Sequence, residues 1–600
     1  MHLTFRPQHK RGFTLIESLV GTAVFVLIAV SVYQAYTTLF EIVRVSRLKV
    51  TAAALSNEQF EIMRNLPFAE VGVVAGIPAG KIPPTQTLTR DGITFTAKTT
   101  IRNVDDPFDG TLGGVPNDLS PADYKFAEVE IMCPSCKNFQ PLIFSTSVAP
   151  KNLEGASTNG VLFIRVFDAN GQPIPGANVH IENNAAAPAI AIDDTTNADG
   201  LLQIVDAPPG IEAYEITVSK TGYSQSKTYP TGAVGNPNPV TPHATVAIQQ
   251  VTQMSFSIDK TSTVNVASIT ETCTPISSVD FLLQGSKIIG TGPDILSYSS
   301  NQTTSVAGQK NITGLTWDTY TASLTDAAYD LIGSIPLSPF TLNPNATQEL
   351  KLLVASKKPN RLLVTVKDSS TQLPLSDSSV KLEKAGYDKT LITGNGFLTQ
   401  TDWSGGSGQD AFVDPAKHFA SDGNLDIANP TGELRLKQVF AAYETSGVIT
   451  SSTLDTGSVS NFHQVVWQPQ DQPIPSGTNS VKFQIATNND QTTWNFLGPD
   501  GTSNTYYTLA NPIINATHNG DRYIRYKMFM KTDDQTFTPN ISDVSITFTS
   551  SCVAPGQVSF ASLAAGGYTM TVSRTGYQTS VSTVTITSAG WQQQEVVLTP

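Results

Sequence analysis

A carboxylate lies at the start of a long apolar segment of the sequence. The stretch KRGFTLIESLVGTAVFVLIAV covers residues 10–30, and Glu17 is the only charged residue between positions 13 and 35. A charged side chain at the centre of a membrane-spanning helix costs roughly 2.5 to 3.5 kcal/mol on insertion scales. A buried carboxylate is tolerated when it meets an opposite charge and hydrogen-bond donors. Some interaction should therefore offset the cost of Glu17.

The apolar segment of residues 13–35 is long enough to span a bilayer, whose hydrocarbon core is about 30 Å thick. The leader before it, residues 1–12, contains Arg6, Lys10 and Arg11 and no acidic residue. The positive-inside tendency therefore keeps the N-terminus in the cytoplasm and exports the chain downstream. An ordinary secretory signal has a shorter apolar core followed by a small-residue cleavage site. Here the apolar run begins directly after Gly12, which makes this boundary the expected processing point.

The motif KRGFTLIES resembles the class III signal of type IV pilins and pseudopilins of bacteria. The resemblance implies that a prepilin peptidase cuts between Gly12 and Phe13 and that the new N-terminal residue, Phe13, is methylated. Glu17 then becomes the fifth residue of the mature chain, whose carboxylate pairs in this family with the N-terminal amine of a neighbouring subunit. The alternative is a plain single-pass anchor with an acid near the membrane surface.

A long helix is expected to continue past the membrane. No proline occurs between residues 34 and 65, apolar residues recur there at near-helical spacing, and Pro67 is a natural stop. The predicted helix of residues 13–66 has roughly fifty residues and is about 80 Å long. The resemblance implies that this helix is the stalk of a pilin, although it lacks the proline that commonly bends that stalk.

Residues 67–152 are expected to form a small β head. The segments DGITFTAKTTIRNV (91–104) and DYKFAEVEIMC (123–133) alternate apolar and polar positions, which is typical of half-buried antiparallel strands. The loop between them contains Asp105, Asp106 and Asp109, and oxygen-rich loops of this kind can hold calcium. An acidic solvated turn is the alternative. No other metal or cofactor is expected.

The remainder of the 600 residues is β in character and long enough for several further domains. From Ser157 on, short alternating runs are separated by turn signals, as in β-sandwiches. The motif YEITVSKTGYSQS from Tyr214 recurs as YTMTVSRTGYQTS from Tyr568, and the segments that begin at Gly160 and Asn360 also correspond. These units resemble carboxypeptidase-regulatory-like and collagen-adhesin B-type domains, which serve as spacers on surface proteins.

The predicted fold class is therefore mainly β, with a long N-terminal pilin helix and small β head followed by several antiparallel sandwiches. We expect the first regulatory-like sandwich at residues 157–250, a diverged second one at 251–357 and a third at 358–408 plus 552–600. The third is interrupted, because its two halves lie far apart in the sequence. Residues 409–551 are expected to form an inserted, jelly-roll-like sandwich that resembles discoidin and galactose-binding domains.

Several side chains in and just before this insert could contact a glycan. Aromatic rings can stack on sugar rings, although most aromatics in a sandwich are core residues or cross-strand pairs. The candidate ligand-binding residues are Trp403, Trp494, Asn488 and Asp490. The seven histidines are scattered, and no nucleophile elbow or phosphate loop occurs. We therefore expect no enzyme, and a polysaccharide-acting enzyme in residues 409–551 is a less favoured alternative.

Four cysteines occur in a chain that is expected to reach an oxidising compartment, where disulfides are permitted. Cys133 and Cys136 in the CPSC motif are expected to form a local disulfide. A zinc or redox site is the alternative, but no second cysteine pair or histidine cluster supports it. Cys273 and Cys552 lie in different predicted domains, and their pairing stays open.

The sequence as a whole predicts a large minor pilin or pseudopilin. Its net charge of −13 argues against nucleic acid as the main partner. The expected partners are prepilin peptidase, other pilin subunits, the membrane and a glycan or other surface ligand. The chain would cross the cytoplasmic membrane once before assembly and then lie in an extracytoplasmic filament. Surface adhesion or ligand capture is the leading function, and a secretion-system pseudopilin that contacts substrate or envelope is the alternative.

Overall fold

The computed structural model describes residues 14–150, 156–408, 416–430, 432–588 and 590–600. The chain forms two compact units, one of Met1–Asp259 with Ile289–Ile295 and one of Lys260–Ile288 with Leu296–Pro600. One long helix and many antiparallel sheets confirm the mainly β fold class.

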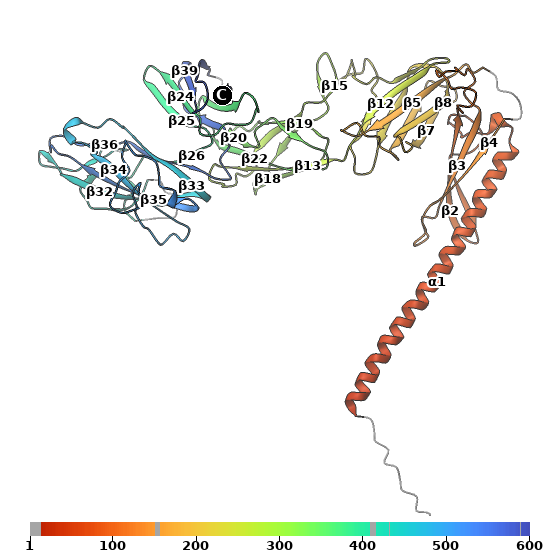
Figure 1. Ribbon diagram of the computed structural model, residues 1–600, viewed down its shortest axis with the longest axis horizontal. Helices are drawn as coiled ribbons and strands as arrows, with labels where there is room; N and C mark the ends of the chain where they lie inside the picture. Colours follow the sequence, from red (N-terminus) through yellow and green to blue (C-terminus); the bar gives the residue numbers. More distant parts are fainter. Residues whose placement is uncertain (1–13, 151–155, 409–415, 431, 589) are drawn as a thin grey trace, which may run out of the picture. The chain divides into compact units, whose positions relative to one another are not determined.

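The first unit begins with the long helix and the β head. Helix α1 (Leu15–Asn65) has 51 residues and ends just before Pro67. Its C-terminal part packs on an antiparallel sheet in the order β1-β2-β3-β4, formed by β1 (Thr85–Arg90), β2 (Ile93–Val104), β3 (Tyr124–Met132) and β4 (Leu142–Val148). Every second residue of β2 and β3 is buried, and Leu55, Phe95 and Val129 belong to the shared core. Figure 1 shows the N-terminal half of α1 extending beyond this sheet.

The first sandwich completes this unit with two sheets, β12-β5-β8 and β10-β9-β6-β7, and β11 pairs with β9. Its strands are β5 (Gly160–Phe167), β6 (Asn178–Asn183), β7 (Ile190–Thr195), β8 (Leu201–Ala207), β9 (Gly210–Ser219), β10 (Ser226–Lys227), β11 (Ala244–Val246) and β12 (Val251–Ser257). The inward side chains of both sheets form one apolar core. Periodic burial along β9 follows from the alternating sequence EITVS.

Buried polar contacts join the head to this sandwich within the unit. Arg102 on β2 pairs with Asp194 on β7, with 2.5 Å between Nε and Oδ2. Within the head itself, Lys125 on β3 donates from Nζ to the carbonyl oxygens of Phe68 and Val71, each at 2.6 Å, and burial lowers the pKa of Lys125 to about 8. Phe68 and Lys125 line a cavity of about 640 Å³ between the head and the sandwich. The head and the first sandwich are therefore in direct contact.

The second unit contains two further sandwiches and the insert. The second sandwich has the sheets β18-β13-β22-β20 and β17-β14-β19-β21. Its strands are β13 (Ser262–Ile269), β14 (Asp280–Gly285), β17 (Ser299–Thr303), β18 (Gln309–Leu315), β19 (Asp318–Leu324), β20 (Tyr329–Ile335), β21 (Phe340–Leu342) and β22 (Thr347–Ser356). A short hairpin of β15 (Ile288–Gly290) and β16 (Ile295–Leu296) lies between β14 and β17 in the chain.

The third sandwich is built from two distant parts of the chain, as the internal repeat predicts. Its sheets are β38-β23-β41 and β25-β24-β39-β40. The strands before the insert are β23 (Arg361–Asp368), β24 (Ser379–Lys384) and β25 (Tyr387–Ile392). Those after it are β38 (Gln557–Phe560), β39 (Gly566–Ser573), β40 (Ser580–Ile586) and β41 (Trp591–Leu598).

All three sandwiches are closed in the same way. In each of them the last strand pairs in parallel with the first, as β12 with β5, β22 with β13 and β41 with β23. The predicted boundary between residues 250 and 251 is therefore wrong, because β12 closes the first sandwich and does not open the second. The local pattern of residues 251–257 does not show which sandwich they belong to, because a parallel closing strand pairs with a strand that is distant in the sequence.

A buried tyrosine recurs at the same place in the three sandwiches. Tyr214, Tyr320 and Tyr568 are at most 1% exposed. Each donates its hydroxyl hydrogen to a backbone carbonyl four to six residues upstream, at 2.6 to 3.0 Å. This arrangement fixes the corner that leads into a core strand, as the tyrosine corner of immunoglobulin-like sandwiches does. The tyrosine that begins the repeated motif, Tyr214 in one copy and Tyr568 in the other, is thus a structural residue.

The insert is a separate sandwich with its own core. It is formed by β26 (Gly396–Gln400), β27 (His418–Ser421), β28 (Leu425–Asp426), β29 (Leu434–Leu436), β30 (Gln438–Val439), β31 (Ala442–Tyr443), β32 (Ser446–Ser451), β33 (Leu454–Gln468), β34 (Val481–Asn488), β35 (Asp521–Lys531), β36 (Asn540–Ile541) and β37 (Asp543–Thr549). The long strand β33 pairs with β35 near its start and with β37 along its second half. It thus connects the two sheets around the core.

The insert begins earlier than residue 409. Strand β26 pairs along its whole length with β37, and the side chain of Leu398 packs against the core of the insert. Because β26 and β37 are antiparallel, the chain enters at Gly396 and leaves near Phe548 at the same edge. The prediction assigned residues 396–408 to the third sandwich because the glycine-rich segment after Trp403 was interpreted as the boundary between that sandwich and the insert.

Candidate functional site

The N-terminal half of α1 presents an apolar surface without a partner in the first unit. Leu15, Phe25 and Tyr33 are 86%, 70% and 68% exposed, and the buried helix residues begin only at Leu48. The helix is long and apolar enough to cross a membrane. A surface of this kind requires lipid or other protein to cover it. The N-terminal half of α1 is therefore the first candidate functional site.

Glu17 lies in the first turn of this helix and makes a capping box with Thr14. The backbone N–H and the hydroxyl of Thr14 both donate to Glu17 Oε2 at 2.9 Å, and the N–H of Glu17 donates to Thr14 Oγ1 at 3.3 Å. A carboxylate at this position also complements the positive end of the helix dipole. Glu17 thus has a role within its own subunit that sequence reasoning missed, although the T-x-x-E spacing carries the signal. The predicted cleavage residues Gly12 and Phe13 lie outside the described residues.

Trp403 is not available for ligand contact. It is 1% exposed in the core of the insert, and its Nε1–H donates to Tyr526 Oη at 2.8 Å. Tyr526 in turn donates to Gln400 Oε1 at 2.7 Å. The prediction of Trp403 as a ligand-binding residue is therefore wrong, because this side chain fastens the start of the insert to its core.

Asn488 and Asp490 form a turn after β34. Asn488 is 8% exposed, and its amide donates to Thr493 O at 2.6 Å while its Oδ1 accepts from the N–H of Gln491. Asp490 Oδ1 accepts from the N–H groups of Thr492 and Thr493, and these hydrogen bonds lower the pKa of Asp490 to about 2. Both side chains are thus occupied in shaping the turn. The ligand role predicted for Asn488 does not fit its burial.

Trp494 differs from the other candidates because it lies on the outer side of the sheet. The guanidinium carbon of Arg525 lies 4.2 Å from the ring centre of Trp494 and 4.1 Å from that of Phe419. Arg525 and Tyr526 are neighbours on β35 and point to opposite faces, so Trp494 and Trp403 do not form one site. Burial lowers the pKa of Arg525 to about 10.

Two lysines next to Arg525 repeat this cation–aromatic arrangement. Lys527 Nζ lies 4.5 Å from the ring centre of Phe496, and Lys482 Nζ lies 3.6 Å from that of Tyr506. We name Arg525, Lys527, Lys482 and the aromatic rings over them the cation–aromatic strip. The lysines were missed in the sequence because β34 and β35 become neighbours only in the fold. The strip combines the buried Arg525 and two partly exposed lysines with aromatic rings, and the lysines can contact polar or anionic groups.

The acidic loop of the head gathers a different set of residues from the predicted one. Asp105 Oδ1, Asp118 Oδ2 and Asp123 Oδ1 are buried and have no hydrogen-bond partner among the described residues. Burial raises the pKa of Asp105 to about 6, and the negative charges of Asp118, Asp123 and Asp109 add to this effect. In the described part of the chain, no three acidic, histidine or cysteine side chains are arranged to hold a metal ion. Calcium binding by Asp105, Asp106 and Asp109 therefore stays a prediction.

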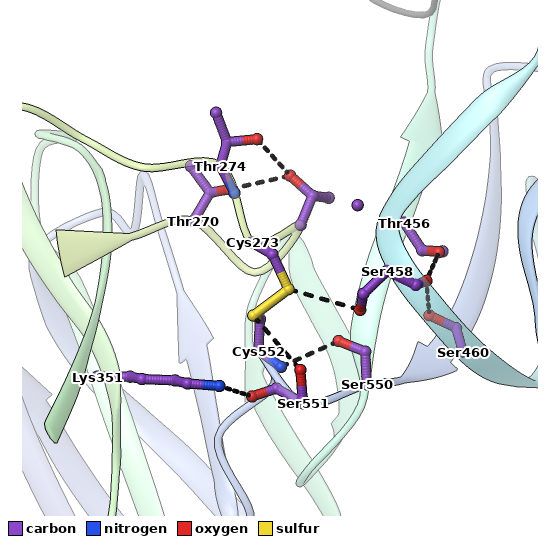
Figure 2. The surroundings of a disulfide bond; sticks show 12 residues. Thr270, Cys273, Thr274, Lys351, Thr456, Ser458, Ser460, Ser550, Ser551 and Cys552 are labelled. Carbon is purple, nitrogen blue, oxygen red and sulfur yellow. Dashed lines mark hydrogen bonds between the residues drawn. A yellow bond between two sulfur atoms is a disulfide. The ribbon is translucent and has the colours of Figure 1, made fainter. Parts of the chain in front are cut away.

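All four cysteines are disulfide-bonded. Cys133 is bonded to Cys136 within the head, and Cys273 is bonded to Cys552 across 279 residues of sequence. Figure 2 shows the second disulfide among residues of the second sandwich, the insert and the segment that leads into the third sandwich. The sequence left this second pairing open because it cannot show which loops meet.

Comparisons with known proteins give a family match for one segment. No curated protein matches the sequence. Among solved structures, the chain is similar to the Bacillus anthracis TIE protein, with 11% identity over 86% of this chain and 73% of that one and a TM-score of 0.16. It is also similar to the minor pilin GBS52 of Streptococcus agalactiae, with 15% identity over 33% of this chain and 96% of that one and a TM-score of 0.17. At these TM-scores neither likeness carries an argument about function. Residues 161–266, which include the whole of β6 to β12, match the carboxypeptidase regulatory-like domain.

Proposed function

We propose that the protein is a large minor pilin or pseudopilin that is cleaved after Gly12, assembles into a filament through α1 and presents its β-sandwiches outside the cell. The single observation that supports this best is the exposed apolar half of α1, which begins with Glu17 directly after the KRGFT motif. An apolar helix of this length can lie first in lipid and later among other helices. Regulatory-like sandwiches fit the role of spacers that hold the insert away from the filament.

Substitutions at the N-terminus test the assembly step. Gly12→Ala should block processing, and N-terminal sequencing that finds a normally trimmed chain would defeat the cleavage proposal. Glu17→Gln keeps an oxygen that can accept the Thr14 hydrogen bonds but removes the charge. If Glu17 pairs with the amine of a neighbouring subunit, Glu17→Gln should be processed normally yet be depleted from sheared filaments by about tenfold or more. Full incorporation of Glu17→Gln would show that only capping matters.

We further propose that the insert captures a surface ligand through the cation–aromatic strip. The supporting observation is that Trp494, Lys527 and Lys482 are partly exposed on one face, whereas Trp403 is buried. Trp494→Ala should reduce binding of the exported protein on a glycan array by about tenfold, which corresponds to roughly 1.4 kcal/mol. Phe537→Ala removes a 43% exposed aromatic side chain elsewhere on the insert and serves as the control. Equal binding by both variants would remove the strip from consideration.

The alternative proposal is a secretion-system pseudopilin whose sandwiches contact substrate or envelope. The same helix and spacers would serve it. Deletion of the gene in the producing bacterium distinguishes the pilus proposal from the secretion-system proposal. Loss of surface attachment with normal secretion supports a role in a pilus. Loss of secretion with normal attachment supports the pseudopilin.

A further inference from the structure

The second sandwich and the insert are connected by two different covalent routes. Along the chain, the route from the end of β22 at Ser356 to the start of β26 at Gly396 passes through β23, β24 and β25 of the third sandwich. The other route is the disulfide between Cys273, in the loop after β13, and Cys552, in the segment after β37. The disulfide thus bypasses the third sandwich.

The two routes differ greatly in the length of chain that they contain. About 40 residues separate the second sandwich from the insert along the chain, which would extend to about 130 Å if unfolded. The disulfide route contains four residues from Ile269 to Cys273 and three from Thr549 to Cys552, or about 25 Å when extended. Under a pulling force the shorter route becomes taut first. The third sandwich then carries little of the force.

Close packing holds the disulfide loop on the insert. A Cβ atom at Gly457 would lie 1.5 Å from the carbonyl oxygen of Thr272, so the backbones of the insert and the second sandwich touch there. Ser458 Oγ lies 3.5 Å from Cys273 Sγ (Figure 2). The loop and β33 of the insert therefore meet directly at the disulfide.

The segment that bears Cys552 is also fastened to the second sandwich. Lys351 Nζ on β22 donates to Ser551 O at 2.8 Å (Figure 2). The side chain of Gln557 accepts from the N–H of Ser334 at 3.1 Å and donates to its carbonyl oxygen at 2.9 Å. Cys552 itself is 4% exposed. This segment is held in place on both sides of the disulfide.

We propose that the Cys273–Cys552 disulfide has a mechanical function: it transmits tension from the insert to the second sandwich and shields the third sandwich from unfolding. The proposal rests on the proposed capture of a surface ligand by the insert, because a captured ligand is the source of the force. A covalent bond holds under forces at which the hydrogen bonds and apolar contacts of a sandwich give way. The interrupted sandwich would otherwise be the weak element between anchor and ligand.

Single-molecule force spectroscopy on the full exported chain tests the proposal without any ligand. One peptide handle is inserted at Val306, which is 88% exposed on the second sandwich, and the other at Phe440, which is fully exposed on the insert. In the wild type we expect the extension step from unfolding of the third sandwich, at most about 130 Å, to be absent until the second sandwich or the insert unfolds. In Cys273→Ser/Cys552→Ser we expect such a step at low force, because the third sandwich now lies in the only route.

Cys133→Ser/Cys136→Ser is the matched control, since it removes the other disulfide, which lies outside the pulled segment. It should behave as the wild type does. If Cys273→Ser/Cys552→Ser fails to fold, a folded molecule with only the Cys273–Cys552 disulfide can be reduced by a phosphine while it is held at low force. The proposal is overturned if this step, of at most about 130 Å, occurs equally with and without the disulfide, or in neither case. Because the handles replace the ligand, this result is independent of whether the insert binds a glycan.

Discussion

At the scale of single residues, the acidic loop of the head makes stability depend on pH. The pKa of Asp105 is raised to about 6 in the folded chain, above its ordinary value of 3.8, so between these values the folded state binds more protons than the unfolded state. A raised carboxyl pKa means that the loop is least stable when Asp105 is charged. The contribution of Asp105 to the stability of the folded head is favourable at low pH and is lost as the pH rises through about 6.

We therefore predict that Asp105→Asn stabilises the head at pH 7.5 by about 1 kcal/mol, after a discount for partial exposure, and has little effect at pH 4. Calorimetry of the exported chain at both pH values measures the difference between variant and wild type. Asp109→Asn, which removes an exposed carboxylate of the same loop, is the control and should have a smaller effect. If calcium at millimolar concentration raises the wild-type transition at pH 7.5 and Asp105→Asn abolishes that rise, a cation fills the loop.

Single residues also show what the sequence could not predict. Glu17 was found because its charge interrupts an apolar run, and this signal needs no tertiary structure. Trp403 and Trp494 look alike in sequence, yet one is buried in the core and the other stacks on Arg525. Their difference depends on which face of the insert each reaches. The sequence alone does not show on which face each residue lies, because this depends on how the strands pair.

At the scale of elements, Gly457 allows the insert to approach the second sandwich. Its φ angle is 78°, and its missing side chain leaves room for the carbonyl of Thr272. We predict that Gly457→Ala separates the two surfaces, lowers the fraction of Cys273–Cys552 disulfide and exposes the adjoining segment to protease. Gly423→Ala has the same backbone cost, with φ of 85°, but no atom within 4 Å. Peptide mapping by mass spectrometry should find the disulfide complete in Gly423→Ala and depleted in Gly457→Ala.

Because β26 pairs with β37, the insert can be removed cleanly only together with β26. A short glycine-serine linker in place of residues 396–549 should leave the third sandwich folded, because β26 and β37 leave the insert at the same edge. Removal of residues 409–551, the boundary suggested by the sequence, would leave β26 without its partner β37. We predict that the first variant is soluble with a cooperative thermal transition and that the second aggregates. Equal behaviour of the two would mean that β26 is dispensable.

The internal repeat indicated β-sandwiches, whereas it did not give the domain boundaries. The paired motifs around Tyr214 and Tyr568 pointed to two corresponding sandwiches, in each of which a buried tyrosine recurs on a core strand. Both boundary errors involve edge elements, β12 and β26, which pair with strands far away in the sequence. Local patterns identify strands, but long-range pairing assigns them to a sheet.

At the scale of the whole molecule, the bulk carried by each helix would limit how often the protein can occur in the proposed filament. Helices that pack side by side are about 10 Å apart, whereas a compact domain of 100 residues has a radius of gyration of about 13 Å. Each copy of α1 carries the head, three sandwiches and the insert. Neighbouring copies along a closely packed fibre would therefore collide, which favours single copies at a tip or at sparse positions.

Immunogold labelling with an antibody against the insert tests this expectation. We predict a few gold particles per filament, concentrated at one end, and none on filaments from cells that produce Gly12→Ala. Dense labelling along the shaft would contradict the argument from bulk, since it would require neighbouring subunits to accommodate all of their sandwiches. If the label instead stays with the membrane fraction in wild-type cells, the apolar half of α1 is a permanent membrane anchor. In that role Glu17 needs only the capping box that it forms with Thr14.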